Sequence, residues 1–545
     1  MTTRPSRIHR GPVVLAAVAV LALAAAGCTD TATSSSAVPT SGTRSLLPQP
    51  PGPTARLGEQ QVDTAVGQLD SIVQDAMSRT GVPGVAVAVV YRDQVVYSKG
   101  FGVREVGKPD AVDPDTVFQV ASVSKPVAST IVAGVVGRKT IAWDDPVIKY
   151  NPSFSLRDPF VTANASFADL MSHRSGLYTG AGDLLEDLGF DQDYILPRLN
   201  QQPLDAFRAS YNYSNFGYTE GGVAAADAAK QSWDALAQDT LFGPLGMTSS
   251  SYEHSVYESR PNKALIHVRE DGANGATWQA KYLRDADAEA PAGGLSSSVR
   301  DMAQFIRLQL GAGKFGGTQV IDPAALQETH IPHQDLHTPQ QPGARTQFYG
   351  LGWNVSYDDQ GRLRLDHSGA FALGAATNVA LLPVEQLGIV TFTNGYPIGV
   401  PEAVNNAFFD AAQNGRPTVD WLGFYGKALA ASEEQPPNPY DTAPAHPKPP
   451  QALTAYTGTY DSPYYGPLTV AEGNGKLQIT MGPPEKPTTF PLTAYDGDTF
   501  TFASIGENAT GTSGAIFKPG PDGRIDGVTL TFYDQRGLGT FTRGA

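Results

Sequence analysis

The apolar positions along the chain predict secondary structure most clearly where the folded part begins. From Leu57 onward they recur every three or four residues, which is the period of a helix with one buried face: Val62, Val66, Leu69, Val73 and Ala76. Two apolar runs that follow, 84–91 and 95–102, predict strands joined by a polar turn.

A second strand pair is predicted at 376–383 and 387–394, and a helical pattern follows it at 402–413. The long segment between the two strand pairs is mostly helical in pattern. We therefore expect an α/β (α+β) domain whose terminal segments share an antiparallel sheet, with the helical region inserted over that sheet.

Beyond a proline-rich stretch, short β-rich runs alternate with turns up to the last residues. Asn474-Gly475 and Asp522-Gly523 are turn pairs typical of hairpins. These runs predict a small antiparallel β-barrel. The predicted division of the chain is a lipoprotein signal peptide (1–27), a disordered tether (28–56), the α/β domain (57–415), a Pro-rich linker (416–451) and the C-terminal barrel (452–545).

The first residues have the composition of an export signal. Arg4, Arg7 and Arg10 precede an apolar run, 12–27, that is too short to span a bilayer. The run ends at Cys28, the only cysteine, in a sequence that resembles the bacterial lipobox except for Ala25, where leucine is usual. We expect lipidation of Cys28 and an exported, bacterial cell-membrane lipoprotein facing outside the cytoplasm. The alternative is a cleaved signal peptide with an incidental cysteine.

Composition narrows the choice of partners. The chain has 545 residues, 41% of them hydrophobic, and a formal net charge of −15. This charge disfavours a nucleic-acid partner, which would require a basic face. The chain contains no GxxxxGK[ST] phosphate loop and no CxxC or HExxH metal pattern. We therefore expect no cofactor and no metal, and a small-molecule or peptide substrate.

Candidate chemistry is concentrated in the stretch FQVASVSKPVAST, where Ser122 stands three residues before Lys125. Pro126 requires a helix to begin close to Ser122, because proline is tolerated only in the first turn. The serine then lies in the positive field of the helix N-terminus, and Lys125 lies on the same face one turn on. Burial would favour a neutral Lys125 able to accept a proton. SxxK alone is weak evidence, since it also occurs by chance.

Two further motifs follow in order, Tyr213-Ser214-Asn215 and His367-Ser368-Gly369. Together the three motifs resemble those of the serine β-lactamase and penicillin-recognising superfamily, over roughly 60–415. The match is to its class C β-lactamase-like branch, which includes D-alanyl-D-alanine carboxypeptidases, D-aminopeptidases and esterases. The segments LMSHRSGL, PAGGLSSSVRDMAQF and YGLGW are also similar to family segments. The C-terminal part more weakly resembles a lipocalin-like barrel.

The resemblance implies a role for each matched residue. Ser122 would be the acylated nucleophile, Lys125 its base, and Tyr213 a proton shuttle with a pKa lowered by Lys125. Asn215 would bind the substrate amide, and His367, Ser368 and Gly369 would line the cleft. The backbone N–H groups of Ser122 and Ala370 would form the oxyanion hole.

Two neighbouring residues receive no catalytic role. We expect His173 to be structural, bonded to nearby backbone. Asp366 is either a partner of the motif beside it or a solvated charge on the strand, and the sequence leaves both open.

The third motif has histidine where β-lactamases and transpeptidases have lysine. A histidine that titrates near neutrality would attract a substrate carboxylate weakly and in a pH-dependent way. The residue therefore favours a membrane-tethered peptidase or esterase with a Ser-Lys-Tyr acyl-enzyme mechanism. The alternatives are a D-Ala-D-Ala carboxypeptidase or weak β-lactamase, and a non-catalytic binding lipoprotein.

Overall fold

The structure is a computed structural model, and it describes residues 57–272, 275–337, 345–358, 360–433 and 437–544. All of these residues belong to one compact unit, Pro53–Ala545. The predicted signal peptide, tether and lipidated Cys28 lie outside the described residues. Within the described part, no helix has the length and apolar character needed to cross a bilayer.

An eight-stranded antiparallel sheet forms the centre of the first part, in the order β2-β1-β14-β13-β12-β11-β10-β9. Its strands are β1 (Gly84–Tyr91), β2 (Gln94–Gly102), β9 (Gln334–His337), β10 (Gln347–Tyr349), β11 (Asn354–Tyr357), β12 (Leu363–Phe371), β13 (Ala375–Leu382) and β14 (Leu387–Thr393). β1 pairs with β14, so the predicted sharing of one sheet by distant segments is confirmed.

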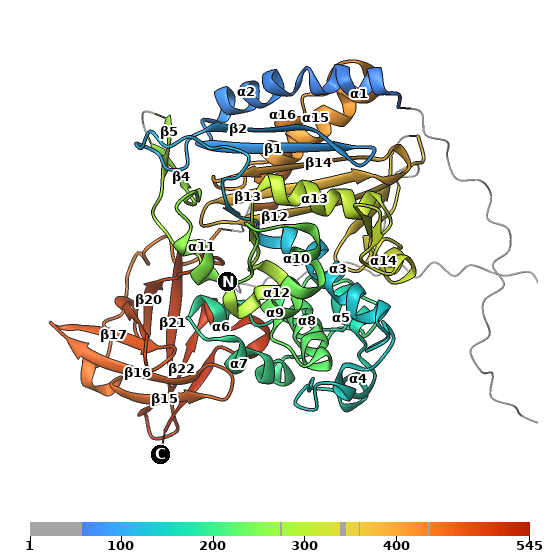
Figure 1. The fold of residues 1–545 in the computed structure, drawn as a ribbon. Helices are drawn as coiled ribbons and strands as arrows, with labels where there is room; N and C mark the ends of the chain where they lie inside the picture. Colours follow the sequence, from blue (N-terminus) through green and yellow to red (C-terminus); the bar gives the residue numbers. More distant parts are fainter. Residues whose placement is uncertain (1–56, 273–274, 338–344, 359, 434–436, 545) are drawn as a thin grey trace, which may run out of the picture. The chain divides into compact units, whose positions relative to one another are not determined.

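Helices cover both faces of this sheet because the middle strands are apolar on both sides. Every residue of β1 is buried, and its side chains alternate between two clusters. Val85, Val87 and Val89 pack with one set of helices: α1 (Glu59–Val66), α2 (Leu69–Thr80) and α15 (Val400–Asn414). Ala86 and Ala88 face the opposite side, which α13 (Val299–Leu310) covers (Figure 1).

One helix lies in the range predicted as a linker. α16 (Trp421–Glu433) packs on α15, although the Pro-rich composition around it predicted no helix. Asp410 of α15 accepts a hydrogen bond from Trp421 Nε1 at 3.0 Å, and Asn406 donates to Tyr425 Oη at 2.9 Å. Long-range contacts therefore stabilise this helix. The single helical pattern predicted from Leu57 is likewise divided at Gly67 into α1 and α2.

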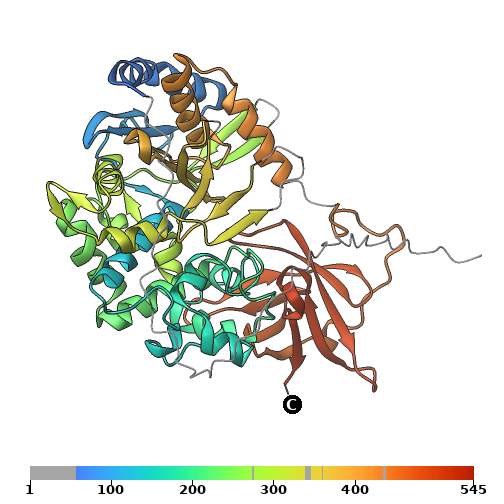
Figure 2. The same ribbon diagram turned by 90° about the vertical axis from the view of Figure 1, so that its right-hand side faces the viewer.

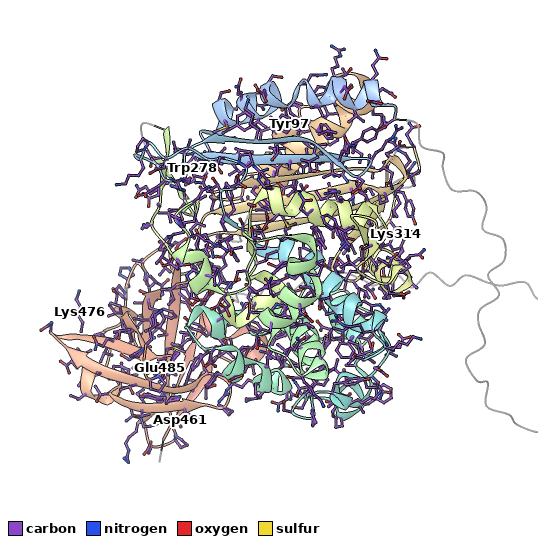
Figure 3. All side chains as sticks on the ribbon, in the orientation of Figure 1. Tyr97, Trp278, Lys314, Asp461, Lys476 and Glu485 are labelled. Atoms are coloured by element: carbon purple, nitrogen blue, oxygen red, sulfur yellow. The ribbon has the colours of Figure 1, made fainter. Side chains whose placement is uncertain are left out.

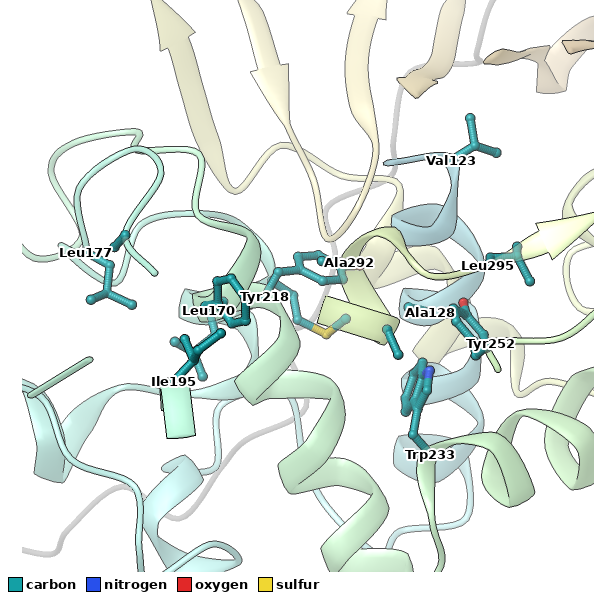
Figure 4. Packing of buried hydrophobic residues seen from close by; sticks show 14 of the residues in the cluster. Val123, Ala128, Leu170, Leu177, Ile195, Tyr218, Trp233, Tyr252, Ala292 and Leu295 are labelled. Carbon is teal, nitrogen blue, oxygen red and sulfur yellow. The ribbon is translucent and has the colours of Figure 1, made fainter. Parts of the chain in front are cut away.

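The inserted region is helical, as predicted. Helix α3 (Ser124–Gly137) is buried from Ser124 to Val135. Helices α8 (Asn215–Ala229) and α12 (Ala290–Gly293) pack against it (Figure 4). The other helices are α4 (Pro159–Asn164), α5 (Phe167–Met171), α6 (Asp183–Asp187), α7 (Gln192–Ile195), α9 (Trp233–Ala237), α10 (Gly243–Leu245), α11 (His254–Ser259) and α14 (Pro323–Thr329). Short strand pairs complete it: β3 (Phe118–Gln119) with β6 (Ser296–Ser297), β4 (Val268–Gly272) with β5 (Gly275–Gln279), and β7 (Lys314–Phe315) with β8 (Thr318–Gln319).

The C-terminal part is a nearly closed, barrel-shaped sheet of nine antiparallel strands, in the order β18-β17-β16-β15-β23-β22-β21-β20-β19 (Figure 2). The predicted fold class is confirmed. Asn474 and Gly475 form the turn between two strands with φ of 54° and 71°, as a tight hairpin requires. The strands are β15 (Gly458–Ser462), β16 (Gly466–Gly473), β17 (Lys476–Met481), β18 (Thr488–Pro491), β19 (Thr493–Asp496), β20 (Thr499–Ala503), β21 (Thr512–Pro519), β22 (Ile525–Leu530) and β23 (Thr540–Arg543).

The loop between β20 and β21 joins the barrel to the helical region. Asp187, at the end of α6, accepts hydrogen bonds from the backbone N–H groups of Glu507 at 2.7 Å and Asn508 at 3.1 Å. The segment between β22 and β23 makes a second contact, the ion pair of Arg536 with Asp205 at 3.0 Å. The bonds to Asp187 hold the loop beside the helices that carry the candidate site.

Candidate active site

Ser122 lies in a tight turn between β3 and α3. The turn is a single 3₁₀ unit, Ala121–Val123, and α3 begins directly after it, with Pro126 in its first turn as predicted. Ala121 has φ of 48°, in the left-handed region that residues with a side chain rarely adopt. The backbone thus turns sharply and places Ser122 just before the N-terminus of α3.

Strand β12 approaches this turn so closely that it requires a glycine. A Cβ atom on Gly369 would lie 2.2 Å from the carbonyl oxygen of Val120 and 3.0 Å from the nitrogen of Ser122. Thr377, on the neighbouring β13, donates to the same Val120 oxygen at 2.7 Å. The backbone of the third motif, at Gly369, therefore packs directly against the turn that carries Ser122.

Lys125 is fully buried beneath Ser122. Its Nζ lies 3.1 Å from Ser122 Oγ, 2.8 Å from Asn215 Oδ1 and 3.0 Å from the carbonyl oxygen of Ala292. Burial lowers the pKa of Lys125 to about 8, although the carboxylate of Glu289 opposes the shift. A fraction of Lys125 is therefore neutral near pH 7, in line with the base role that the resemblance implies.

Tyr213 completes the contacts of the nucleophile, since its Oη donates to Ser122 Oγ at 2.8 Å. The predicted lowering of its pKa is wrong. Burial raises the pKa of Tyr213 well above 10, and the hydrogen bond to Ser122, which opposes the shift, does not reverse it. The phenol therefore remains protonated.

His173 positions Tyr213 without touching Ser122. Its ring lies 4.4 Å from the Tyr213 ring, centroid to centroid, and its Nδ1 accepts the backbone N–H of Ser214 at 3.1 Å. Burial lowers the pKa of His173 well below 6.5, so the ring is neutral. The structural role expected for this histidine agrees with these contacts.

His367 is buried and bonded at both ring nitrogens. Its Nδ1 lies 2.7 Å from the carbonyl oxygen of Ser368, which can only accept, so Nδ1 carries the proton. Nε2 then accepts from Tyr349 Oη at 2.9 Å. Burial and the charge of Lys125 lower the pKa of His367 to about 3. The prediction of a histidine that titrates near neutrality is therefore wrong.

The predicted residues meet at one cavity of about 460 Å³. Ser122, Tyr213, Asn215, His367, Ser368 and Ala370 line it, whereas Lys125 and Gly369 are not among its lining residues. Asn215 accepts a hydrogen bond from Lys125 through Oδ1 and has its Nδ2 3.4 Å from Asp183 Oδ2, and its contact with a substrate amide stays a prediction. Asp366 pairs with Arg364 at 3.0 Å and accepts from Asn354, which makes it a strand charge with local partners.

Several residues of the cavity were missed in the sequence. Tyr349 belongs to the YGLGW segment, whose family likeness was the only signal for it. Six others had no motif to reveal them, because they come from three separate segments of the chain: Asp183, Glu186, Arg284, Glu289, Glu507 and Asn508.

Comparisons with known proteins agree with this geometry. The family model described as Beta-lactamase matches residues 69–413, and the model described as Domain of unknown function (DUF3471) matches 442–539. A structure of the octameric penicillin-binding protein homologue from Pyrococcus abyssi is 18% identical with a TM-score of 0.56, covering 85% of this chain and 98% of that one. At this identity the likeness shows the fold.

Three curated relatives illustrate the range of names in the family. Beta-lactamase-like protein 2 of Dictyostelium discoideum is 24% identical, over 69% of this chain and 66% of its own length, so less than two thirds of that protein is spanned. Unguisins hydrolase ungD of Aspergillus violaceofuscus is 23% identical, over 80% and 82%. Penicillin-binding protein 4 of Amycolatopsis lactamdurans is 29% identical, over 58% and 81%.

The state of His367 gives a testable prediction. Because its pKa is lowered to about 3, the ring should remain neutral and protonated at Nδ1 from pH 5 to pH 8. Long-range ¹H–¹⁵N NMR spectra of the histidines, with His367→Gln for assignment, measure this directly. A His367 midpoint near pH 6.5 would contradict the expectation.

Proposed function

Because this chain belongs to the Beta-lactamase family, we propose that it is an extracytoplasmic serine hydrolase that cleaves an amide or ester through an acyl-enzyme on Ser122. Membership of this family supports a serine hydrolase. The observation that carries the finer proposal is the placement of Lys125 Nζ and Tyr213 Oη at 3.1 and 2.8 Å from Ser122 Oγ, beside the cavity.

In the first proposed step Lys125 is the proton acceptor. With a pKa of about 8, roughly one tenth of the lysines are neutral at pH 7. A neutral Lys125 takes the proton of Ser122 while Oγ forms a bond to the substrate carbonyl carbon. The backbone N–H groups of Ser122 and Ala370 stabilise the negative carbonyl oxygen.

Tyr213 is the proton donor in the next step, because burial keeps its phenol protonated. Its proton passes to the leaving nitrogen or oxygen as the bond from that atom to the carbonyl carbon breaks. The proton held by Lys125 restores Tyr213. Water then attacks the acyl carbon and gives a proton to the same pair. The pair passes this proton to Oγ as the bond from Oγ to the carbon breaks, which releases the acid and free Ser122.

Two alternative functions, a carboxypeptidase or weak β-lactamase and a non-catalytic binding lipoprotein, would use the same site. A relative named penicillin-binding protein supports a D-Ala-D-Ala carboxypeptidase or weak β-lactamase. Those substrates carry a carboxylate, and a neutral His367 provides no charge to pair with it. A binding lipoprotein would keep the cavity without turnover, but two buried groups arranged for proton transfer at one serine favour catalysis.

The intact mass of the purified protein after incubation with a fluorophosphonate, and separately with a penicillin, tests the proposal. We expect a fluorophosphonate adduct in the wild type and none in Ser122→Ala. Penicillin turnover that depends on Ser122 would instead favour the carboxypeptidase or β-lactamase alternative. An unlabelled protein with both reagents would exclude the serine-hydrolase proposal.

The lowered pKa of Lys125 predicts the pH dependence of acylation. A base with a pKa of about 8 is neutral above that pH, so the labelling rate should rise from pH 6 to pH 8 and then level off. Lys125→Ala should lower the rate by about 10²- to 10⁴-fold. Lys149→Ala, which removes an exposed lysine, is the matched control and should keep both rate and profile. A rate independent of pH in this range would count against Lys125 as the base.

We also propose that the protein is held at the outer face of the cell membrane through a lipid on Cys28. The support is the basic and apolar sequence of residues 4–27 before this cysteine. Lipid on one cysteine would attach the enzyme without a spanning helix.

Expression of the full chain in a bacterium that processes lipoproteins tests the attachment. The wild type should incorporate labelled palmitate and partition into the Triton X-114 phase, whereas Cys28→Ser should be unlabelled and aqueous. Ser36→Ala, a change in the predicted tether, serves as the control. An unlabelled wild type would leave only the incidental-cysteine alternative.

A further inference from the structure

One wall of the catalytic cavity is formed by carboxylates that the proposed mechanism does not use. We call this wall the acidic recess; its members are Asp183, Glu186, Glu289 and Glu507, arranged around Arg284. The side chains of Glu289 and Glu186 are only 4% and 7% exposed. The recess shares its cavity with Ser122.

The recess has fewer positively charged neighbours than carboxylates. Arg284 Nη2 donates to Glu186 Oε2 at 2.8 Å and to Glu289 Oε1 at 2.9 Å, and its Nε lies 4.0 Å from Glu507 Oε2. Lys125 interacts electrostatically with Glu289, Asp183 and Glu186, and Asn215, which accepts a hydrogen bond from Lys125, places its Nδ2 3.4 Å from Asp183 Oδ2. Four carboxylates thus face one guanidinium and one partly neutral lysine.

The pKa values of all four carboxyl groups in the recess are raised. Burial raises the pKa of Asp183, Glu289 and Glu507 to about 7 each. The pKa of Glu186 rises to about 8, although the adjacent Arg284 opposes the shift. A cation entering the recess would therefore be stabilised by several carboxylates at once.

Each recess carboxylate also has an oxygen without a hydrogen-bond partner. Among the described residues, Asp183 Oδ1, Glu186 Oε1, Glu289 Oε2 and Glu507 Oε2 are buried and accept no hydrogen bond, and the one buried donor beside them without a hydrogen-bond partner is Arg284 Nε, 4.0 Å from Glu507 Oε2. Nearby Asp187 differs, since it accepts from two backbone N–H groups and from Asn508 Nδ2. Buried acceptors are normally satisfied, so four unpaired oxygens at one cavity indicate a missing donor.

The barrel loop holds one of these acceptors in place. Glu507 Oε1 accepts the backbone N–H of Ala372, just after β12. The loop turns at Gly506 with φ of 89°, and a Cβ there would lie 2.2 Å from Asp187 Cγ. The loop is therefore fitted closely against α6, and Glu507 is a fixed part of the wall.

We propose that the acidic recess binds the ammonium group of the substrate, so that the enzyme acts on amides or esters that carry a free primary amine near the scissile bond. This rests on the proposed function. An ammonium has three donors and no acceptor, which matches a group of unpaired carboxylate oxygens. Among the described residues no group of His, Cys, Asp or Glu is arranged to hold a metal ion, which favours an organic cation here.

Protection of Ser122 from fluorophosphonate measures this binding without requiring turnover. At pH 7.0, D- or L-alanine amide should slow labelling of the wild type at concentrations about tenfold or more below those of the matching N-acetylalanine amide, since acetylation removes the charge. Glu289→Gln and Glu507→Gln should each remove most of that preference, because one charge-assisted hydrogen bond contributes about tenfold or more to binding. The neutral amide keeps the side-chain shape.

The control is Asp461→Asn, which removes an exposed carboxylate from strand β15 of the barrel (Figure 3). It should retain the preference for the free amine. Thermal unfolding of each variant separates loss of binding from loss of folding, and Glu186→Gln replaces any variant that fails to fold.

The two proposals fail differently. If Ser122 is not labelled at all, the proposed function fails. If Ser122 is labelled but the free amine protects no better than its N-acetyl form, the recess does not bind the ammonium. A preference that survives both Glu289→Gln and Glu507→Gln would also overturn the assignment.

Discussion

The burial of Lys125 is the constraint on which the rest of the site depends. An amine removed from water must find its partners in the protein, and here they are a serine, an asparagine and the Ala292 carbonyl. Each partner is supplied by a separate element: the turn before α3, the start of α8, and α12. The packing of these helices around α3 is therefore what brings nucleophile and base together.

Burial away from water also determines the charge of the groups around Lys125. His173 and His367 are both neutral, and Tyr213 is protonated, because burial disfavours the charged form of each group. The neutral His367 is oriented by Tyr349 and by the carbonyl oxygen of Ser368, and so acts as a fixed part of the wall. The recess is the exception, because there carboxylates are buried in excess of their cations.

Local patterns were sufficient to predict β1, β13, β14 and α15, and ordered motifs were sufficient to place Ser122, Lys125 and Tyr213 around one cavity. Local patterns did not reveal α16, which depends on Asp410 and Asn406 of another helix. The pKa values of Tyr213 and His367 were predicted in the wrong direction or range because the extent of burial is a tertiary property. Glu507 carries no sequence signal, since only the packing of a distant barrel brings it to the cavity.

The contribution of Glu507 to the cavity makes the site depend on contacts between distant parts of the chain. Ser122 and Lys125 are synthesised early, whereas the loop that completes their cavity lies close to the C-terminus and is held by contacts that span 320 residues. The entropy of closing so long a loop must be paid before these contacts contribute, which slows folding. A chain whose barrel has not docked would carry the nucleophile beside a cavity that lacks Glu507 and Asn508.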